Sequence, residues 1–232
     1  MGFGMIEVEV VRVFVDADGL GGSPLGVVRD GGSLRGLPQR QDLARRLGFS
    51  ETVFVDDAGR GAVDIYTPSE RLDFAGYPLI GAAWLLGEHA APVEVLRTPA
   101  GDVRTWTEGD HTWIAGRPEW VSDKRTRQFG SAAEVDALPA PPPGEGWLYA
   151  WAWVDEAAGT IRARGFPRRG DVIVEDEATG AAAMLLAGEL GSDLRIRQGA
   201  GSDLVARVGE AGWVELGGRV AWEEPRRRLL EV

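Results

Sequence analysis

The sequence predicts an α+β fold with two pseudo-symmetric halves, each a curved, mostly antiparallel sheet wrapped around one central apolar helix. Three observations lead to this prediction. Strand patterns dominate the chain, two helix patterns are apolar on nearly every side, and a short sequence rich in Ala and Leu occurs twice. At 232 residues, of which 44% are hydrophobic, the chain is long enough for one large or two small domains.

Strand patterns are recognised by alternating apolar and polar residues or by β-branched runs. They lie at residues 6–15, 52–55, 62–66, 93–96, 103–107, 112–115, 147–154, 160–166, 194–198, 204–208, 213–216 and 219–222. Turn residues separate most of these segments, and Glu108-Gly109-Asp110 and Gly217-Gly218 each predict a hairpin. We interpret the glycine-rich segment 21–26, GGSPLG, as a turn, with an anion-binding nest as the alternative.

Helix patterns occur in three segments. Residues 41–47 form a short amphipathic pattern with Arg45 and Arg46 on the polar side, whereas residues 79–86 and 179–190 are apolar nearly all round. A helix without a polar face needs cover on all sides. We therefore expect each of the two apolar helices inside a curved sheet.

A repeat and a proline-rich segment divide the chain. Residues 82–86, AAWLL, and 182–186, AAMLL, are near copies, and similar elements surround them in the same order, which favours duplication. Residues 139–146, PAPPPGEG, fit neither a helix nor a central strand, and we expect a linker or surface loop there. The predicted halves are residues 1–117 and 118–232, with the last strand a candidate to cross between them.

Composition excludes several classes of protein. The net charge of −11 argues against nucleic acid and anionic membrane surfaces as partners, because both would repel the chain. The absence of cysteine excludes disulfides and thiolate chemistry, and only two histidines are available, so a histidine-rich metal site is not expected. The N-terminus lacks a signal-peptide pattern and no apolar run is long enough for a membrane span, which predicts a cytoplasmic protein.

Four ordered motifs resemble one family. They are GGSPLGVV at 21–28, FSETVFV at 49–55, DFAGYPLIGAA at 73–83 and EDEATGAAA at 175–183, and the Gln198-Gly199 turn extends the likeness. Together they resemble the PhzF-like isomerases of phenazine biosynthesis, which have the diaminopimelate-epimerase-like fold. The resemblance implies a cleft between two domains, a homodimer, a small carboxylate-bearing substrate, and no metal or organic cofactor.

The resemblance assigns general acid/base catalysis to Glu51, which would move a proton between carbons of the substrate. A glutamate suited to this work must hold a proton near neutral pH, which requires desolvation or a nearby negative charge. The apolar neighbours of Glu51 in FSETVFV favour a partly dry setting at the start of a strand. The alternative is an ordinary glutamate at the strand edge.

Asp176 is the second candidate catalytic residue, and the resemblance assigns it to positioning the substrate across the cleft. It lies between Glu175 and Glu177, after a strand-like run at 172–174 and just before the second apolar helix. A carboxylate there would also stabilise the helix N-terminus. Backbone N–H groups around three residues at the two helix starts are candidate carboxylate ligands. These residues are Gly76, Gly180 and Ala181.

Three departures from the family pattern affect the candidate substrate-binding residues. Tyr77 stands where the family has histidine, Ala181 where it has serine, and Ser23 where it usually has asparagine. Tyr77 keeps a hydrogen-bonding hydroxyl but exchanges protons less readily than imidazole. We therefore expect a cofactor-free isomerase with a substrate of its own, or a carboxylate-binding protein that has lost the chemistry.

A glycoside hydrolase is a third hypothesis. It requires the carboxyl groups of Glu51 and Asp176 to lie about 5 to 9.5 Å apart. Nine tryptophans could line a sugar groove, but Trp151 and Trp153 alternate along one strand and Trp84 falls in an apolar helix. Packing in the core or in an interface is the preferred interpretation of these aromatic residues.

Overall fold

A computed structural model shows the fold of residues 5–34, 36–89, 92–121, 124–168 and 173–231. Four α-helices are described: α1 (Leu37–Leu47), α2 (Gly76–His89), α3 (Ala132–Asp136) and α4 (Gly180–Leu190). The strands of the first part of the chain are β1 (Met5–Val15), β2 (Gly21–Val28), β3 (Thr52–Asp57), β4 (Ala62–Tyr66), β5 (Arg71–Leu72), β6 (Val95–Thr98), β7 (Gly101–Glu108) and β8 (His111–Gly116). Those of the second part are β9 (Lys124–Gln128), β10 (Trp147–Asp155), β11 (Thr160–Phe166), β12 (Leu194–Gln198), β13 (Ser202–Val208) and β14 (Val214–Glu231).

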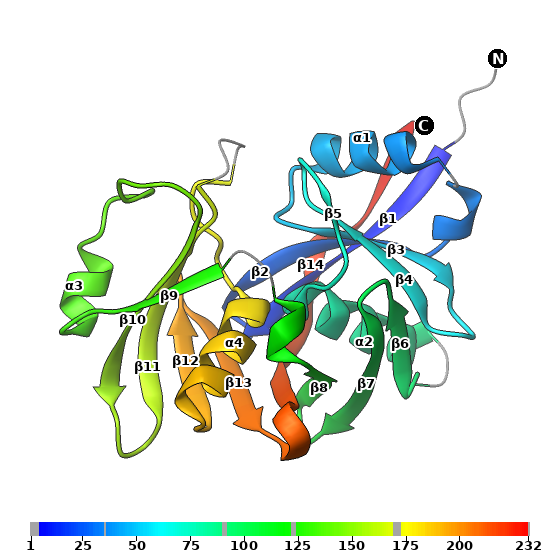
Figure 1. The fold of residues 1–232 in the computed structure, drawn as a ribbon. Coiled ribbons are helices and arrows are strands. Elements are labelled where there is room, and N and C mark those ends of the chain that lie inside the picture. The colour runs from blue at the N-terminus through cyan, green and yellow to red at the C-terminus, as the bar shows by residue number, and fades with distance from the viewer. Residues whose placement is uncertain (1–4, 35, 90–91, 122–123, 169–172, 232) are drawn as a thin grey trace.

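The N-terminal strands close into a ring around α2. The hydrogen-bonded order is β1-β2-β3-β4-β6-β7-β8-β14, and β14 also pairs with β1. Figure 1 shows α2 among these strands. Ten of its residues are buried, which agrees with a sequence that has no polar face.

The C-terminal strands continue the same sheet in the order β14-β13-β12-β11-β10-β9 and carry α4 (Figure 1). The start of β14 pairs with β8 on one side and with β13 on the other, and its later residues pair with β1. The last strand therefore joins the N-terminal ring to the C-terminal sheet. The boundary between residues 117 and 118 stays a prediction.

The two halves repeat one order of elements. In the first half, a β3-β4 hairpin precedes α2, and β6 then returns parallel to β4. In the second half, a β10-β11 hairpin precedes α4, and β12 returns parallel to β11. The near-copies AAWLL and AAMLL occupy corresponding helices. The predicted fold of two pseudo-symmetric halves is thus confirmed, with parallel pairs inside a sheet that is otherwise antiparallel.

Most predicted strands and all three predicted helices are present, with earlier starts for two helices. α1 begins at Leu37, with a proline in its first turn, and α2 begins at Gly76. The hairpin around Gly109 is confirmed, and the segment 139–146 is a loop without regular structure. Within the described residues, none of the helices combines the length and hydropathy that a membrane span needs.

Three local predictions are wrong or incomplete. The segment 21–26 is part of strand β2 and not a turn, because only Gly21 and Gly22 have positive φ before the chain extends beside β1. Ile173 and Val174 form no strand, and Val172 lies outside the described residues. Gly217-Gly218 is not a hairpin, because β14 runs straight through it.

Close packing of aromatic rings explains the glycine pair inside β14. A Cβ on Gly217 would lie 2.5 Å from the Trp113 ring, and one on Gly218 would overlap the ring of Phe14. The two glycines therefore let rings from β8 and β1 lie directly on the strand. Their role is close approach of side chains and not a change of chain direction.

We predict that Gly217→Ala lowers the free energy of unfolding by about 1–3 kcal/mol, because the new methyl group overpacks the site at Trp113. Denaturant unfolding measures the change. Gly87→Ala, within α2, is the control. Its Cβ would come no closer than 3.9 Å to a neighbouring atom, so this substitution is expected to be neutral or to stabilise the fold by up to about 1 kcal/mol. Equal stability of Gly217→Ala and the wild type would contradict the packing argument.

Candidate active site

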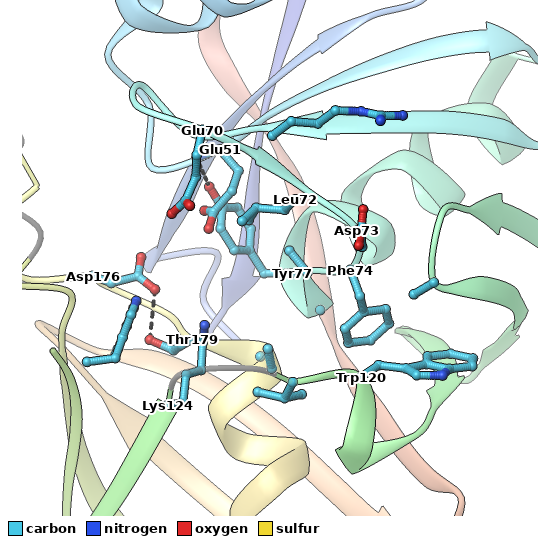
Figure 2. A pocket seen from close by; sticks show the side chains of 18 of the residues that line it. Glu51, Glu70, Leu72, Asp73, Phe74, Tyr77, Trp120, Lys124, Asp176 and Thr179 are labelled. Carbon is cyan, nitrogen blue, oxygen red and sulfur yellow. Dashed lines mark hydrogen bonds between the residues drawn. The ribbon is translucent and has the colours of Figure 1, made fainter.

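A cavity of about 460 Å³ lies where α2 and α4 begin. Figure 2 shows side chains from both halves of the chain pointing into it. The residues that line it are Glu51, Glu70, Arg71, Leu72, Asp73, Phe74, Ala75, Gly76, Tyr77, Ala100, Glu119, Trp120, Val121, Lys124, Trp147, Asp176, Thr179, Gly180 and Ala181.

The N-termini of α2 and α4 touch at two glycines. A Cβ on Gly76 would lie 2.9 Å from the backbone nitrogen of Ala181, and a Cβ on Gly180 would lie 2.9 Å from that of Tyr77. The Leu216 side chain also lies against both glycines, because its Cδ2 would be 2.7 Å from a Cβ on Gly76 and 2.6 Å from one on Gly180. Because the first N–H groups of a helix have no acceptor within the helix, this contact gathers donors from two helices at one end of the cavity.

Glu51 reaches the cavity from the residue before β3. Its backbone N–H donates a hydrogen bond of 3.0 Å to the hydroxyl of Tyr77, which stands in the first turn of α2. This bond ties the start of β3 to the start of α2. The Glu51 side chain is thereby placed on the cavity wall beside Tyr77 (Figure 2).

Tyr77 is a buried, protonated hydroxyl at the centre of the site. Burial raises the pKa of the Tyr77 hydroxyl well above its usual value, and the carboxylates of Glu51 and Asp176 raise it further. A phenolate there would have to form without water and next to negative charge. Tyr77 therefore offers a hydrogen bond across the working pH range and does not exchange its proton as imidazole does.

Asp176 faces the cavity from the segment before α4. It is 3% exposed, its backbone N–H donates to the carbonyl of Gly165, and its carboxylate accepts a 2.7 Å hydrogen bond from the Thr179 hydroxyl (Figure 2). The carboxylate comes from the opposite half of the chain to Glu51. Substrate in the cavity would meet one carboxylate from each half.

The neighbouring carboxylates of Asp176 have structural roles. Glu175 accepts a 2.8 Å hydrogen bond from the guanidinium of Arg164. Glu177 accepts hydrogen bonds from the Ala200 N–H at 2.8 Å and from the Ser202 hydroxyl at 3.0 Å. Of the three acidic residues in the motif, Asp176 is the one that lines the cavity.

Other charged residues complete the cavity wall and were not singled out from the sequence. Lys124, the first residue of β9, lies 4.7 Å from the centroid of the Trp147 ring. Arg71 donates a 2.6 Å hydrogen bond to buried Asp64, so part of its charge is engaged away from the cavity. Within the described ranges, no three acidic or histidine side chains are grouped so that they could hold a metal ion.

The structure brings six of the seven sequence-predicted site residues to one cavity. These are Glu51, Gly76, Tyr77, Asp176, Gly180 and Ala181. Ser23 is the exception. It is buried on β2, opposite Val13 of β1, and does not line this cavity, so the structure gives its predicted contact with substrate no support.

Solved structures of one fold class resemble the whole chain. A PhzF-family phenazine biosynthesis protein from Enterococcus faecalis matches with a TM-score of 0.74, at 16% identity over 99% of each chain. A hydroxyproline epimerase from Agrobacterium vitis matches with a TM-score of 0.63, at 11% identity over 98% of this chain and 93% of the other. The chain therefore has the PhzF-like and epimerase-like fold.

Sequence comparison points to the same family. Residues 11–119 match the family model of phenazine biosynthesis-like proteins, PhzC-PhzF. The resemblance of this chain to the PhzF-like family is thereby confirmed, by sequence over that segment and by fold over nearly the whole chain.

Curated relatives share shorter segments. An uncharacterized isomerase of Pasteurella multocida is 37% identical over 106 residues, which are 43% of this chain and 36% of the relative. A trans-2,3-dihydro-3-hydroxyanthranilate isomerase of Pseudomonas chlororaphis is 39% identical over 83 residues, which are 34% of this chain and 29% of the relative. The chain thus spans about a third of the length of the curated relatives that it matches. Both relatives are named as isomerases.

We predict that the tyrosines resist ionisation in the folded protein. Burial raises the pKa of Tyr66 to about 12 and raises the pKa values of Tyr77 and Tyr149 above their usual value. The pKa values of these tyrosines in the folded protein exceed the value of about 10 in the unfolded chain. The contribution of the three tyrosines to the free energy of unfolding is therefore complete below about pH 10, and it is lost as the pH rises further and the unfolded chain ionises first. Ultraviolet absorbance of phenolate, followed with unfolding experiments against pH, measures both effects.

The protein unfolded in guanidinium serves as the control for this titration, because its tyrosines should ionise near pH ~10. The chain has three tyrosines, so each contributes a visible share of the absorbance change. Ionisation of any tyrosine near pH ~10 in the folded protein would contradict the burial argument for that residue.

Proposed function

We propose that the protein is a cofactor-independent isomerase that shifts a double bond or inverts a carbon centre in a small carboxylate-bearing metabolite. Glu51 is the general acid/base and Asp176 positions the substrate. One observation carries this proposal: two carboxylates, 125 positions apart by their residue numbers (176 − 51), line one cavity at which two helix N-termini meet.

Substrate binding follows from the helix ends. Backbone N–H groups at the starts of α2 and α4 attract a carboxylate, because they are hydrogen-bond donors at the positive ends of two helix dipoles. Gly76 and Gly180 lack side chains that would separate the two ends. A carboxylate held there leaves the rest of a small substrate between Glu51 and Asp176.

Proton transfer follows from the position of Glu51. As a carboxylate it removes a proton from a substrate carbon, and the electron pair of the broken C–H bond delocalises into the adjacent unsaturated or carboxylate group. As a carboxylic acid it then returns the proton to another carbon. For inversion, a proton from solvent adds to the opposite face of the same carbon, and Glu51 releases the proton that it took to solvent. The product is an isomer of the substrate, so no oxidant, reductant or leaving group takes part.

Tyr77 supports this chemistry as a fixed hydrogen-bond donor. Its hydroxyl accepts from the Glu51 N–H, and its own proton stays on the oxygen because its pKa is raised by burial and by two carboxylates. A donor that keeps its proton stabilises charge on a neighbouring carboxylate or on the substrate without competing with Glu51 for proton transfer.

The same property of Tyr77 favours a second candidate function, a carboxylate-binding protein without turnover. A histidine at this place could take up and release a proton, and the buried phenol cannot do so near neutral pH. In that case the N–H groups at the helix ends would still hold a carboxylate, and Asp176 would contact another part of the ligand. The two functions differ in one measurable respect, the exchange of carbon-bound hydrogen with solvent.

Glu51→Gln is expected to reduce solvent exchange at a ligand carbon by at least about 100-fold, because an amide cannot act as the base. Proton NMR in deuterated water measures this with a panel of cyclic and α-amino carboxylates. Glu156→Gln, in the exposed turn between β10 and β11, removes the same charge elsewhere and should leave exchange unchanged.

Three outcomes separate the hypotheses. Exchange by the wild type and by Glu156→Gln but not by Glu51→Gln supports the isomerase. Full exchange by Glu51→Gln rules out the Glu51 carboxylate as the base. Saturation-transfer signals from a bound carboxylate, with no exchange by the wild type, favour the binding protein.

A further inference from the structure

A fully buried amide lies directly behind the Asp176 side of the cavity. Gln198, the last residue of β12, is 0% exposed. Its Nε2 donates to the backbone carbonyl of Asp176 at 2.8 Å and to the Thr179 hydroxyl at 2.9 Å. Its Oε1 accepts from the Thr179 N–H at 3.0 Å and from the Tyr149 hydroxyl at 3.1 Å.

These four bonds fix which way the amide of Gln198 points. The Thr179 N–H can only donate, so it must meet Oε1, and the carbonyl of Asp176 can only accept, so it must meet Nε2. The tyrosine supports this arrangement, because burial and the charge of Asp176 raise the pKa of the Tyr149 hydroxyl and keep it a donor. The reversed amide would oppose like groups at two buried positions.

The fixed amide also fixes the proton of Thr179. The Thr179 oxygen accepts from Gln198 Nε2, so its own hydrogen is directed to the Asp176 carboxylate, 2.7 Å away. Without the amide, the hydroxyl could rotate and serve as an acceptor elsewhere. Gln198, which does not line the cavity, thus determines that the Thr179 hydroxyl donates to the Asp176 carboxylate.

We propose that Gln198 is a positioning residue that holds the Thr179 hydroxyl as a permanent donor to Asp176, and so keeps this carboxylate charged and oriented toward the substrate. Gln198 also accepts the hydrogen bond of the Thr179 N–H. The next N–H groups of α4, those of Gly180 and Ala181, are then the ones that face a ligand in the cavity. The benefit to turnover rests on the proposed function, whereas the effect on Asp176 does not.

Several charged or titratable groups surround Asp176. Tyr77 comes from α2, Tyr149 from β10, Lys124 from β9 and Glu51 from the start of β3. Thr179→Val leaves these four side chains and the Tyr149–Gln198 hydrogen bond in place, whereas Gln198→Met also removes the acceptor of the Tyr149 hydroxyl. A change in the titration of Asp176 that both variants share therefore reports the loss of the hydrogen bond from Thr179.

The test is a double-mutant cycle read by NMR. The carboxyl carbon of Asp176 is followed against pH in ¹³C-aspartate-labelled protein and assigned with Asp176→Asn. The variants are Gln198→Met, Thr179→Val and the pair together, with Gln128→Met on the exposed surface of β9 as the matched control. Near-ultraviolet circular dichroism checks that each variant is folded.

The expected result is a rise of about one pH unit in the Asp176 midpoint in each single variant, the shift that follows loss of one hydrogen bond to a charged group. The double variant should shift no further, because both changes remove the same donor. An unchanged midpoint in Gln198→Met, or shifts that add, would overturn the proposal. If Gln198→Met does not fold, Gln198→Glu replaces it and keeps the acceptor oxygen. The effect of the added charge on Asp176 is then the same with and without Thr179→Val, so it cancels in the double-mutant cycle.

A second readout separates this inference from the proposed function. With an exchanging ligand in hand, Gln198→Met should lower the exchange rate about 10-fold while the calorimetric Kd stays within about two-fold of the wild type. Absence of exchange in the wild type would reject the isomerase and leave the Asp176 titration to decide the role of Gln198. Loss of ligand binding in Gln198→Met, with an unchanged titration of Asp176, would show a purely structural role and overturn the proposal.

Discussion

The contact between the two helix N-termini is the constraint on which the rest of this structure depends. Gly76 and Gly180 approach each other so closely that no side chain fits at either position, and Leu216 of β14 packs against both. Two buried helices must therefore enter their sheets from a common point. The cavity, the carboxylates beside it and the strand that joins the halves are arranged around that point.

The single strand β14 makes this arrangement possible. It belongs to the closed N-terminal ring and to the C-terminal sheet, and aromatic rings pack onto its glycine pair. A hairpin at Gly217-Gly218 would have ended the strand before its pairing with β1. The halves are thus joined by continuous hydrogen bonding in addition to the packing of their cores, which holds Glu51 and Asp176 in a fixed relation.

Much of the fold could be predicted from the sequence, because strand alternation and all-apolar helices are local signals. Strand β9, with the sequence KRTRQ, escaped notice because it has no apolar residue, and β2 was hidden by its glycines. The residues of the family motifs predicted most of the candidate site. Lys124 and Trp147 reach the cavity only through tertiary contacts, and so do the hydrogen bonds of Gln198 behind Asp176, which spacing along the chain does not reveal.

The contact between Glu177 and the Gly199–Gly201 turn has an evolutionary consequence. Gly199 has a positive φ, and any Cβ there would collide with the Glu177 carboxylate, which itself binds the Ala200 N–H. The two positions are therefore expected to covary among relatives.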